Sequence, residues 1–97
     1  MQRLPDHGTA RIVGPQLIRC GTSVGANFRA ACRARSHADF IAKLKIVEEE
    51  CDESIYWLEI LRVLNTDILL VQPLIEEANQ ILSIIVASIK TARQNLK

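Results

Sequence analysis

Apolar residues in the first third of the chain recur at intervals of three and four positions. The series is Val13, Leu17, Cys20, Val24, Phe28 and Ala31. This spacing puts the side chains on one face of an α-helix. We predict a helix over about 11–34 that is most regular from Gly14, with Pro15 in its first turn, where a missing N–H costs least. The residues from Pro5 to Thr9 are predicted to form a loop.

A second periodic segment follows a short connection. Ser36, followed three residues later by Asp39, resembles a helix N-cap with a capping box. Beyond it the apolar residues keep a seven-residue rhythm, through Phe40, Leu44, Val47, Cys51, Leu58 and Leu61. Lys45 and Glu49 are four positions apart and stabilise the same helix. We predict a helix over about 37–64.

The third segment is the most apolar, and Asn65 to Asp67 separate it from the second. We predict a helix over about 67–96 that begins at Asp67 or only near Pro73. Its middle is apolar most of the way round, and such a helix is normally buried on more than one side. In a protein of 97 residues the second side requires another subunit, so we predict a homo-oligomer. The residues expected at that interface are Ile84, Val86, Glu48, Glu49 and Asp52.

The composition agrees with a helical fold. Apolar residues make up 48% of the chain and aromatic residues 4%, so aliphatic side chains must fill the core. This favours helices packed on helices over a β-sandwich. A chain of 97 residues has room for one core. We predict an all-α protein with a single helical-bundle domain over residues 1–97.

The formal net charge of +1 hides a strong asymmetry along the chain. Residues 1–45 carry eight Lys and Arg against two Asp and Glu, whereas residues 46–97 carry four against nine. On a helical wheel Arg19, Arg29 and Arg33 share the arc opposite the apolar stripe, and Arg11 joins them if the helix runs through Pro15. Such a protein either pairs its basic and acidic faces or offers the basic face to RNA.

Three glycines lie inside the first predicted helix. Gly14, Gly21 and Gly25 line one flank of the apolar stripe. Each glycine costs about 1 kcal/mol relative to alanine in a helix interior. We expect the close approach of a neighbouring backbone to offset this cost.

The cysteines and the apolar runs indicate the cellular compartment. Cys20, Cys32 and Cys51 are isolated in apolar-periodic segments, without the close pairing of zinc sites, and are expected to be reduced core thiols. The first residues lack a signal-peptide pattern. The longest apolar runs, 68–71 and 84–87, are far shorter than the roughly 20 residues of a membrane span. We expect a cytoplasmic protein without a membrane partner.

Catalytic arrangements are missing from the sequence. His7 and His37 lie near loops with no second ligand at metal-binding spacing, so both are expected to be surface histidines. The carboxylates within 48–59 include same-face pairs, but the Glu-x-x-His motif of di-metal bundle sites is missing. Gly21-x-x-x-Gly25 lacks the lysine of a phosphate-binding loop. We therefore expect no enzyme activity, no metal or cofactor, and no small-molecule substrate.

Several short motifs occur in the order found in one known family. They are Gln16-Leu17-Ile18-Arg19, Thr22-Ser23-Val24-Gly25-Ala26-Asn27, Arg33-Ala34-Arg35-Ser36, Asp39-Phe40, Glu48-Glu49-Glu50 and Tyr56-Trp57-Leu58. From about Arg3 to Arg93 the chain resembles the bacterial four-helix bundle proteins encoded in 23S ribosomal RNA intervening sequences. That family is similar to the accessory variability protein of diversity-generating retroelements. The latter forms a ring of five bundles and binds a reverse transcriptase and nucleic acid through a basic surface.

The resemblance implies an up-and-down antiparallel bundle that assembles into a ring, commonly a homopentamer, with no known enzymatic activity for most members. Two features depart from the family. Its long first helix would precede Arg3, so we expect three long helices here, with only the end of the first family helix within 1–9, through a shortened chain or a late start site. Pro15 also stands where family members have an ordinary helix former.

Two functions remain open at this point. A basic surface could neutralise RNA phosphates, and its candidate residues are Arg11, Arg19, Arg29, Arg33, Arg35, Lys43 and Lys45. Sequence-specific single-strand recognition is disfavoured because no aromatic residues are interleaved to stack bases. In the alternative, the same arginines pair with carboxylates of a neighbouring subunit, and the protein is a purely structural oligomer. The resemblance favours the first, with RNA or a reverse-transcriptase ribonucleoprotein as the partner.

Overall fold

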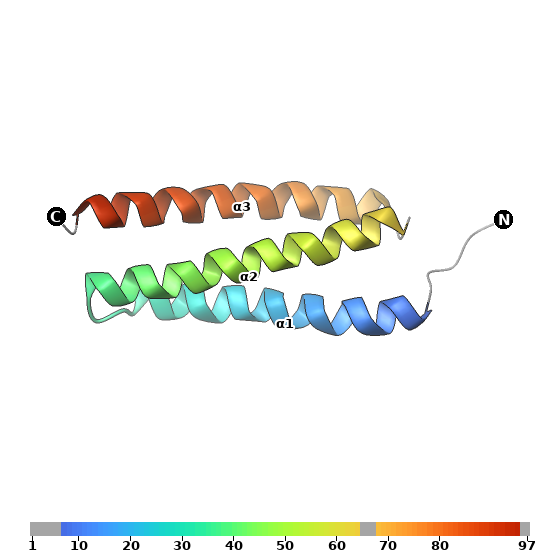
Figure 1. Cartoon of the computed structure of the whole chain (residues 1–97), viewed down its shortest axis with the longest axis horizontal. Coiled ribbons are helices and arrows are strands. Elements are labelled where there is room, and N and C mark those ends of the chain that lie inside the picture. Colours follow the sequence, from blue (N-terminus) through green and yellow to red (C-terminus); the bar gives the residue numbers. More distant parts are fainter. Residues whose placement is uncertain (1–6, 65–67, 96–97) are drawn as a thin grey trace.

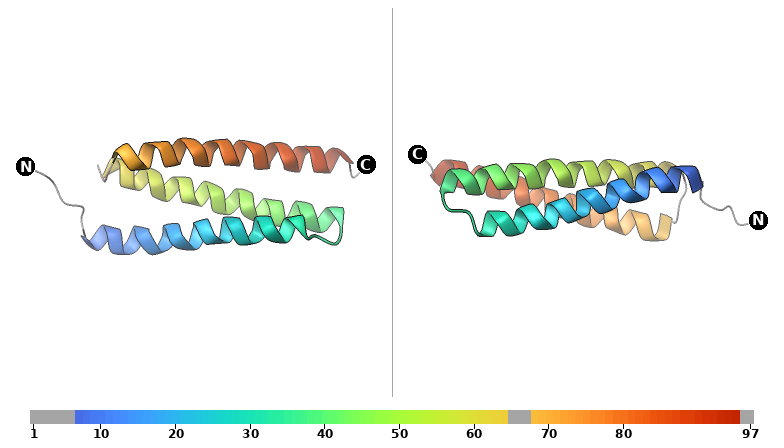
Figure 2. Two further views of the ribbon diagram at one scale, coloured as in Figure 1. Left: turned by 180° about the vertical axis from the view of Figure 1, so that it is seen from behind. Right: turned by 90° about the horizontal axis from the view of Figure 1, so that it is seen from below.

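The computed structural model describes residues 7–64 and 68–95 and shows three long helices (Figure 1). They are α1 (His7–Cys32), α2 (His37–Val63) and α3 (Ile68–Asn95). No strand occurs within these described ranges. The chain runs up, down and up again, and α2 lies between α1 and α3 (Figures 1 and 2). The prediction of an all-α helix bundle is confirmed.

The first helix is longer than its apolar period indicated. α1 begins at His7, so residues 7–9, which were predicted to be loop, are helical. Pro15 is therefore more than two turns inside the helix and not in its first turn. Proline removes the hydrogen bond to the carbonyl of Arg11, four residues earlier. Both residues are exposed, so water can satisfy that carbonyl.

The second and third helices lie within one residue of the predicted ranges. Ser36 caps α2, since its hydroxyl oxygen accepts a hydrogen bond of 3.0 Å from the backbone N–H of Asp39. α3 has Pro73 in its interior rather than at its start. Asp67, the other proposed start of this helix, lies outside the described residues.

The core consists of two hydrophobic clusters around α2. One contains Ala31, Leu44, Val47, Ile85 and Ile89, all at most 4% exposed. The other contains Leu58, Val71 and Ile75, which are 4 to 8% exposed. α1 and α3 both pack on α2, but no Cα atom of α1 comes within 8 Å of a Cα atom of α3 in the described parts. The three helices thus form an open bundle.

Several side chains expected to be buried are exposed instead. Thirteen apolar side chains are buried in the described chain, but another thirteen large apolar side chains are exposed. On α3 these include Ile84 at 64% and Val86 at 45%. Cys32, expected to be a core thiol, is also exposed because it is the last residue of α1, whereas Cys20 and Cys51 are buried. All three cysteines are free thiols.

The glycines of α1 have no close neighbour. A Cβ atom added at Gly14, Gly21 or Gly25 would meet no atom within 4 Å. The expectation that a neighbouring backbone approaches these positions is therefore wrong for the described chain. The reason is the open side of the bundle, where no helix faces this flank of α1.

One helix is long and apolar enough to cross a membrane. Within the described residues, Leu69–Asn95 reaches a mean hydropathy of 1.3. The continuous apolar runs 68–71 and 84–87 are much shorter than this helix, so run length and averaged composition give different results, and the absence of a membrane partner stays a prediction. The criterion is one of length and composition only, and a core helix of a soluble protein also meets it. Only 17% of that window is buried, and the exposed apolar side chains of this helix include Ile81, Ile84 and Val86.

Candidate nucleic-acid interface

The fold turns the asymmetry of charge along the sequence into an asymmetry between the two ends of the bundle. We call residues 21–47 and 84–95 the hairpin half, since they surround the α1–α2 connection, and residues 7–20, 48–64 and 68–83 the far half. The hairpin half carries seven Lys and Arg against one Asp, a net charge of +6. The far half carries three against eight, a net charge of −5.

Contacts between neighbouring helices show where along the helix axes the boundary between these halves lies. Arg19 of α1 binds Glu50 of α2 at 3.1 Å, and the thiol of Cys51 donates to the carbonyl of Ala78 of α3 at 3.5 Å. Both contacts lie near the middle of the bundle, so the three helices pass from one half to the other at similar levels. The two charges are therefore separated along the helix axes rather than on opposite faces.

The hairpin half holds five of the seven residues predicted to contact nucleic acid. Arg29, Arg33 and Arg35 are exposed at the end of α1 and in the connection, and Lys43 and Lys45 are partly exposed on α2. No ion pair joins the three arginines to a carboxylate in the described ranges. Their charges are thus available to a ligand.

The third helix adds two cations that the sequence reasoning did not include. Lys90 and Arg93 line a hollow of about 390 Å³ between α2 and α3, together with Lys45 of α2. Lys45 is also 3.7 Å from Glu48 on the same helix. The antiparallel order of the helices could have predicted this position for Lys90 and Arg93, because it brings the C-terminal end of α3 back to the α1–α2 connection (Figure 1).

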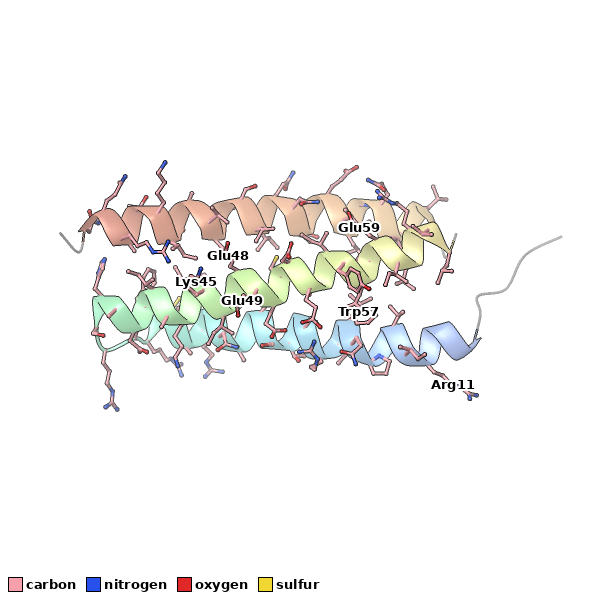
Figure 3. The ribbon with its side chains drawn as sticks, viewed as in Figure 1. Arg11, Lys45, Glu48, Glu49, Trp57 and Glu59 are labelled. Carbon is pink, nitrogen blue, oxygen red and sulfur yellow. The ribbon has the colours of Figure 1, made fainter. Side chains whose placement is uncertain are left out.

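The remaining two candidates lie in the far half. Arg11 is exposed at the opposite end of α1 from the connection (Figure 3). Arg19 is held within the chain, where it forms ion pairs with Glu50, at 3.1 Å, and with Glu53. The structure therefore does not bring these arginines together with the other five.

Glu53 is the centre of a polar cluster at the α1–α2 contact. The indole N–H of Trp57 donates to its carboxylate at 3.2 Å, the thiol of Cys20 is a second donor, and Arg19 is a third. These hydrogen bonds, that of Trp57 first, lower the pKa of Glu53 below its usual value. Burial, followed by the Glu53 carboxylate, raises the pKa of Cys20 to about 11, so the thiol stays protonated and unreactive at neutral pH.

The same cluster contains a possible set of metal ligands. One atom each of Cys20, Glu50 and Glu53 lies within 4.8 Å of the others. Arg19 already forms ion pairs with both carboxylates, and a metal would require the protonated thiol to lose its proton. These three side chains therefore fit a cluster of ion pairs and hydrogen bonds between α1 and α2, and they fit a metal centre less well.

His37 has a structural contact that its sequence position did not indicate. Its Nε2 atom lies 2.8 Å from the carbonyl oxygen of Ala92, to which it donates, and its ring is 6.4 Å from that of Phe40. This histidine therefore joins the start of α2 to the end of α3, in addition to contacting solvent. The side chain of His7 is outside the described part of the structure.

The residues expected at an oligomer interface are partly brought together by the fold, since Val86 and Glu48 line the same hollow. Ile84 and Val86 lie on different flanks of α3, since Ile84 lines a hollow with Phe40 and Val86 lines the one with Lys45. Glu48, Glu49 and Asp52 lie on α2, where Figure 3 labels the first two.

Comparisons with known proteins identify the family. The family model described as 23S rRNA-intervening sequence protein matches residues 1–87. A crystal structure of a protein of unknown function from the S23 ribosomal protein family of Bacteroides thetaiotaomicron is 38% identical, with a TM-score of 0.75. That match covers 81% of this chain and 71% of the other. No curated protein matches, and neither similarity names a catalytic family. The chain belongs to the 23S rRNA-intervening sequence protein family.

Proposed function

We propose that this chain is a non-enzymatic, cytoplasmic bundle protein that binds RNA, alone or in a ribonucleoprotein, through the cations of the hairpin half. The observation that carries the proposal is the collection of seven Lys and Arg, from all three helices and the connection, against one carboxylate within the hairpin half, Asp39, and one at its border, Glu48. A surface of one sign attracts a polyanion from a distance and holds it by neutralising phosphates. The negative far half also orients the bundle, because it repels the same polyanion.

The binding is expected to depend on RNA shape and phosphates more than on base sequence. Tyr56 and Trp57 lie in the far half, Phe40 is half-buried, and Phe28 of the hairpin half is 49% exposed. Stacking platforms that read single-stranded bases need exposed aromatic side chains within the basic groove. The hairpin half therefore presents a single exposed phenyl ring among its cations within the described chain, and not the series of rings that reads successive bases.

The test compares two double variants that remove the same charge. Arg29→Ala/Arg33→Ala removes two cations from the hairpin half, and Arg11→Ala/Arg62→Ala removes two exposed cations from the far half. Binding to a structured RNA is measured by fluorescence anisotropy over a range of salt concentrations. We expect the first variant to bind about ten-fold more weakly, with the slope of log K against log salt reduced by about 2. The second variant should bind as the unchanged protein does.

Two results would contradict the proposal. If both variants weaken binding equally, net charge alone controls it and the hairpin half has no special role. If no binding is measurable at low salt, RNA is not the ligand.

A second candidate function is self-assembly alone, with the basic residues pairing with carboxylates of a neighbouring subunit. Thirteen large exposed apolar side chains within the described chain favour it. Under this alternative, Arg29→Ala/Arg33→Ala lowers the oligomer mass measured by light scattering, whereas RNA binding through these residues leaves that mass unchanged.

A further inference from the structure

The hollow between α2 and α3 is lined by charged side chains of both helices. Lys45 and Glu48 of α2 border it on one side (Figure 3), and Lys90 and Arg93 of α3 border it on the other. Its volume is about 390 Å³, and small-molecule sites have about 300–1,000 Å³. The arginines of α1 and of the connection do not line it. The hollow therefore has the size of a site for one chemical group, not for a continuous nucleic-acid backbone.

The residues that α3 contributes share one face of that helix. They are Val86, Ile89, Lys90, Arg93 and Gln94, which follow one another at intervals of three, one, three and one. Lys90 and Arg93 are exposed, and within the described ranges neither forms an ion pair with a carboxylate. The amide group of Gln94 adds neutral hydrogen-bond donors. This face of α3 therefore offers two unpaired cations and an amide beside α2.

The helix dipole alone does not account for both cations of α3. Arg93 lies in the last turn, where a positive charge compensates the negative end of the helix. Lys90 precedes that turn, and the effect of the dipole falls off within it. Both cations line the hollow together with Lys45, so three like charges face one space. Such an arrangement is electrostatically unfavourable unless an anion lies between them.

The charge of the lining indicates which anion fits. Three cations and one carboxylate give the hollow a net charge of +2, and the carboxylate, Glu48, lies 3.7 Å from Lys45. A phosphate monoester carries a charge of about −1.5 to −2 at pH 7 and presents three strong acceptor oxygens. An internal phosphodiester of RNA carries a single negative charge, as a carboxylate does. The monoester is therefore the better match for both the charge and the three charged donors.

The hollow also has an apolar part. Val86 is 45% exposed at its edge, whereas Ile89 belongs to the core and is 4% exposed. Inorganic phosphate would leave the Val86 side chain in contact with water. The sugar or base of a nucleotide would cover it, which is favourable for an apolar surface. The lining therefore fits an organic phosphate better than the free ion.

We propose that this hollow binds the terminal phosphate monoester of a nucleotide, either at the end of an RNA chain or in a free nucleoside monophosphate. With RNA as the source, the inference rests on the proposed function. The arginines of α1 and of the connection then contact internal phosphates by charge, and the hollow recognises the end of the chain.

The first test compares one RNA hairpin with different ends. The hairpin carries a fluorophore in its loop and has a 5′-monophosphate, a 3′-monophosphate or hydroxyl groups at both ends. Fluorescence anisotropy at a fixed salt concentration measures the affinity. We expect the unchanged chain to bind at least one phosphorylated hairpin about ten-fold more tightly than the hydroxyl hairpin, because hydrogen bonds between charged groups are the strong ones.

Matched variants show whether the hollow is responsible for that preference. Lys90→Ala/Arg93→Ala removes two cations from the hollow and should bring the ratio of the two affinities to about one. Arg29→Ala/Arg33→Ala removes the same charge outside the hollow. It should weaken binding of all hairpins alike and leave the ratio at about ten-fold. Circular dichroism checks that both variants remain helical.

The second test locates the site in the unchanged chain. Magnetic resonance spectra of the backbone amides are recorded with adenosine 5′-monophosphate, with adenosine and with inorganic phosphate, each at the same millimolar concentration. We expect the largest chemical-shift changes with the monophosphate, at the amides of 45–48 and 86–94, which contain the lining residues. Adenosine should leave these amides unchanged, and inorganic phosphate should shift them less.

The outcomes separate this inference from the proposed function. Equal affinity for phosphorylated and hydroxyl hairpins would overturn the inference, as would a preference that persists in the Lys90/Arg93 variant. The proposed function stands in both cases if binding of the hydroxyl hairpin falls with salt. If no hairpin binds but adenosine 5′-monophosphate shifts the amides of the hollow, the proposed function fails and the hollow is a mononucleotide site. Equal shifts with adenosine, or no shift with the monophosphate, would overturn the inference.

Discussion

The two halves of the bundle differ in how far their cationic side chains form ion pairs and hydrogen bonds within the chain. In the far half, Arg19 joins Glu50 and Glu53 across two helices, and Arg62 donates to Gln72 of α3 at 3.2 Å. In the hairpin half the only ion pair of a cation among the described residues is Lys45 with Glu48, at 3.7 Å. In the far half an arginine thus joins two helices. In the hairpin half the arginines have no ion pair in the described ranges, and these are the cations that we propose bind RNA.

The two hydrophobic clusters differ in packing as well, although Val13 and Cys20 of the far half, outside the clusters, are also nearly fully buried. The cluster of the hairpin half includes Leu44 and Val47, at 1% and 0% exposure, whereas Leu58, at 8%, is the most exposed member of the far cluster. Truncating a fully enclosed side chain lowers the free energy of unfolding more than truncating a partly exposed one, because the surrounding structure relaxes only partly into the cavity left behind. The more tightly enclosed of the two clusters therefore lies in the half that carries the exposed cations.

The largest expected effect is on the free energy of unfolding when the Leu44 side chain is truncated. Leu44→Ala should lower the free energy of unfolding by about 3 kcal/mol, and Leu58→Ala by about 2 kcal/mol. Urea denaturation at a fixed protein concentration measures both, since association also affects stability. An equal or larger effect for Leu58 would show that the two clusters do not differ in packing.

The second prediction concerns the two cations that α3 contributes. Lys90→Ala/Arg93→Ala should weaken RNA binding about ten-fold and reduce its salt slope by about 2, as expected for two lost phosphate contacts. Gln80→Ala/Gln94→Ala changes two exposed polar residues on the same helix without changing the charge. Unchanged affinity in the Lys90/Arg93 variant would restrict the interface to α1, the connection and α2.

The helices could be predicted from the sequence, but the grouping of the charges could not. Local signals set the helix positions: apolar spacing gives the buried stripe, and Ser36 gives the start of α2. The position of Lys90 and Arg93 beside Lys45 depends on how far α3 returns along α2, which is a tertiary property. Arg19 was grouped with the outward arginines because a helical wheel cannot show that its side chain is long enough to reach the next helix.

The glycines and the cysteines also show that tertiary contacts could not be predicted from the sequence alone. The spacing of the glycines predicted a close neighbour at Gly21 and Gly25, and the described chain supplies none. It also gave no means to separate the buried Cys20 from the exposed Cys32, because both follow the apolar period of α1. Burial at the end of a helix depends on what covers that end.

A smaller effect is expected at the connection within the hairpin half. Ser36→Ala removes the N-cap of α2 and should lower the free energy of unfolding by about 1 kcal/mol. Ser83→Ala is the matched control, since this exposed serine bonds to the carbonyl of Asn79 in a helix interior, where alanine is at least as favourable. If both changes have the same effect, the cap does not stabilise the connection that carries Arg33 and Arg35.

The last prediction tests the polar cluster of the far half through its pH dependence. Its three hydrogen-bond donors lower the pKa of Glu53 in the folded protein, whereas a glutamate in the unfolded chain has a pKa of about 4.3. The stabilisation by Glu53 is therefore present above about pH 4.3 and is lost as the pH falls through the lower folded value. Glu53→Gln should make the folded state less stable at pH 7 and flatten the decline of stability below about pH 4.3. Glu59→Gln, an exposed change two turns along α2, should leave that decline nearly unchanged; an equal flattening in both would mean that Glu53 is not the carboxylate responsible.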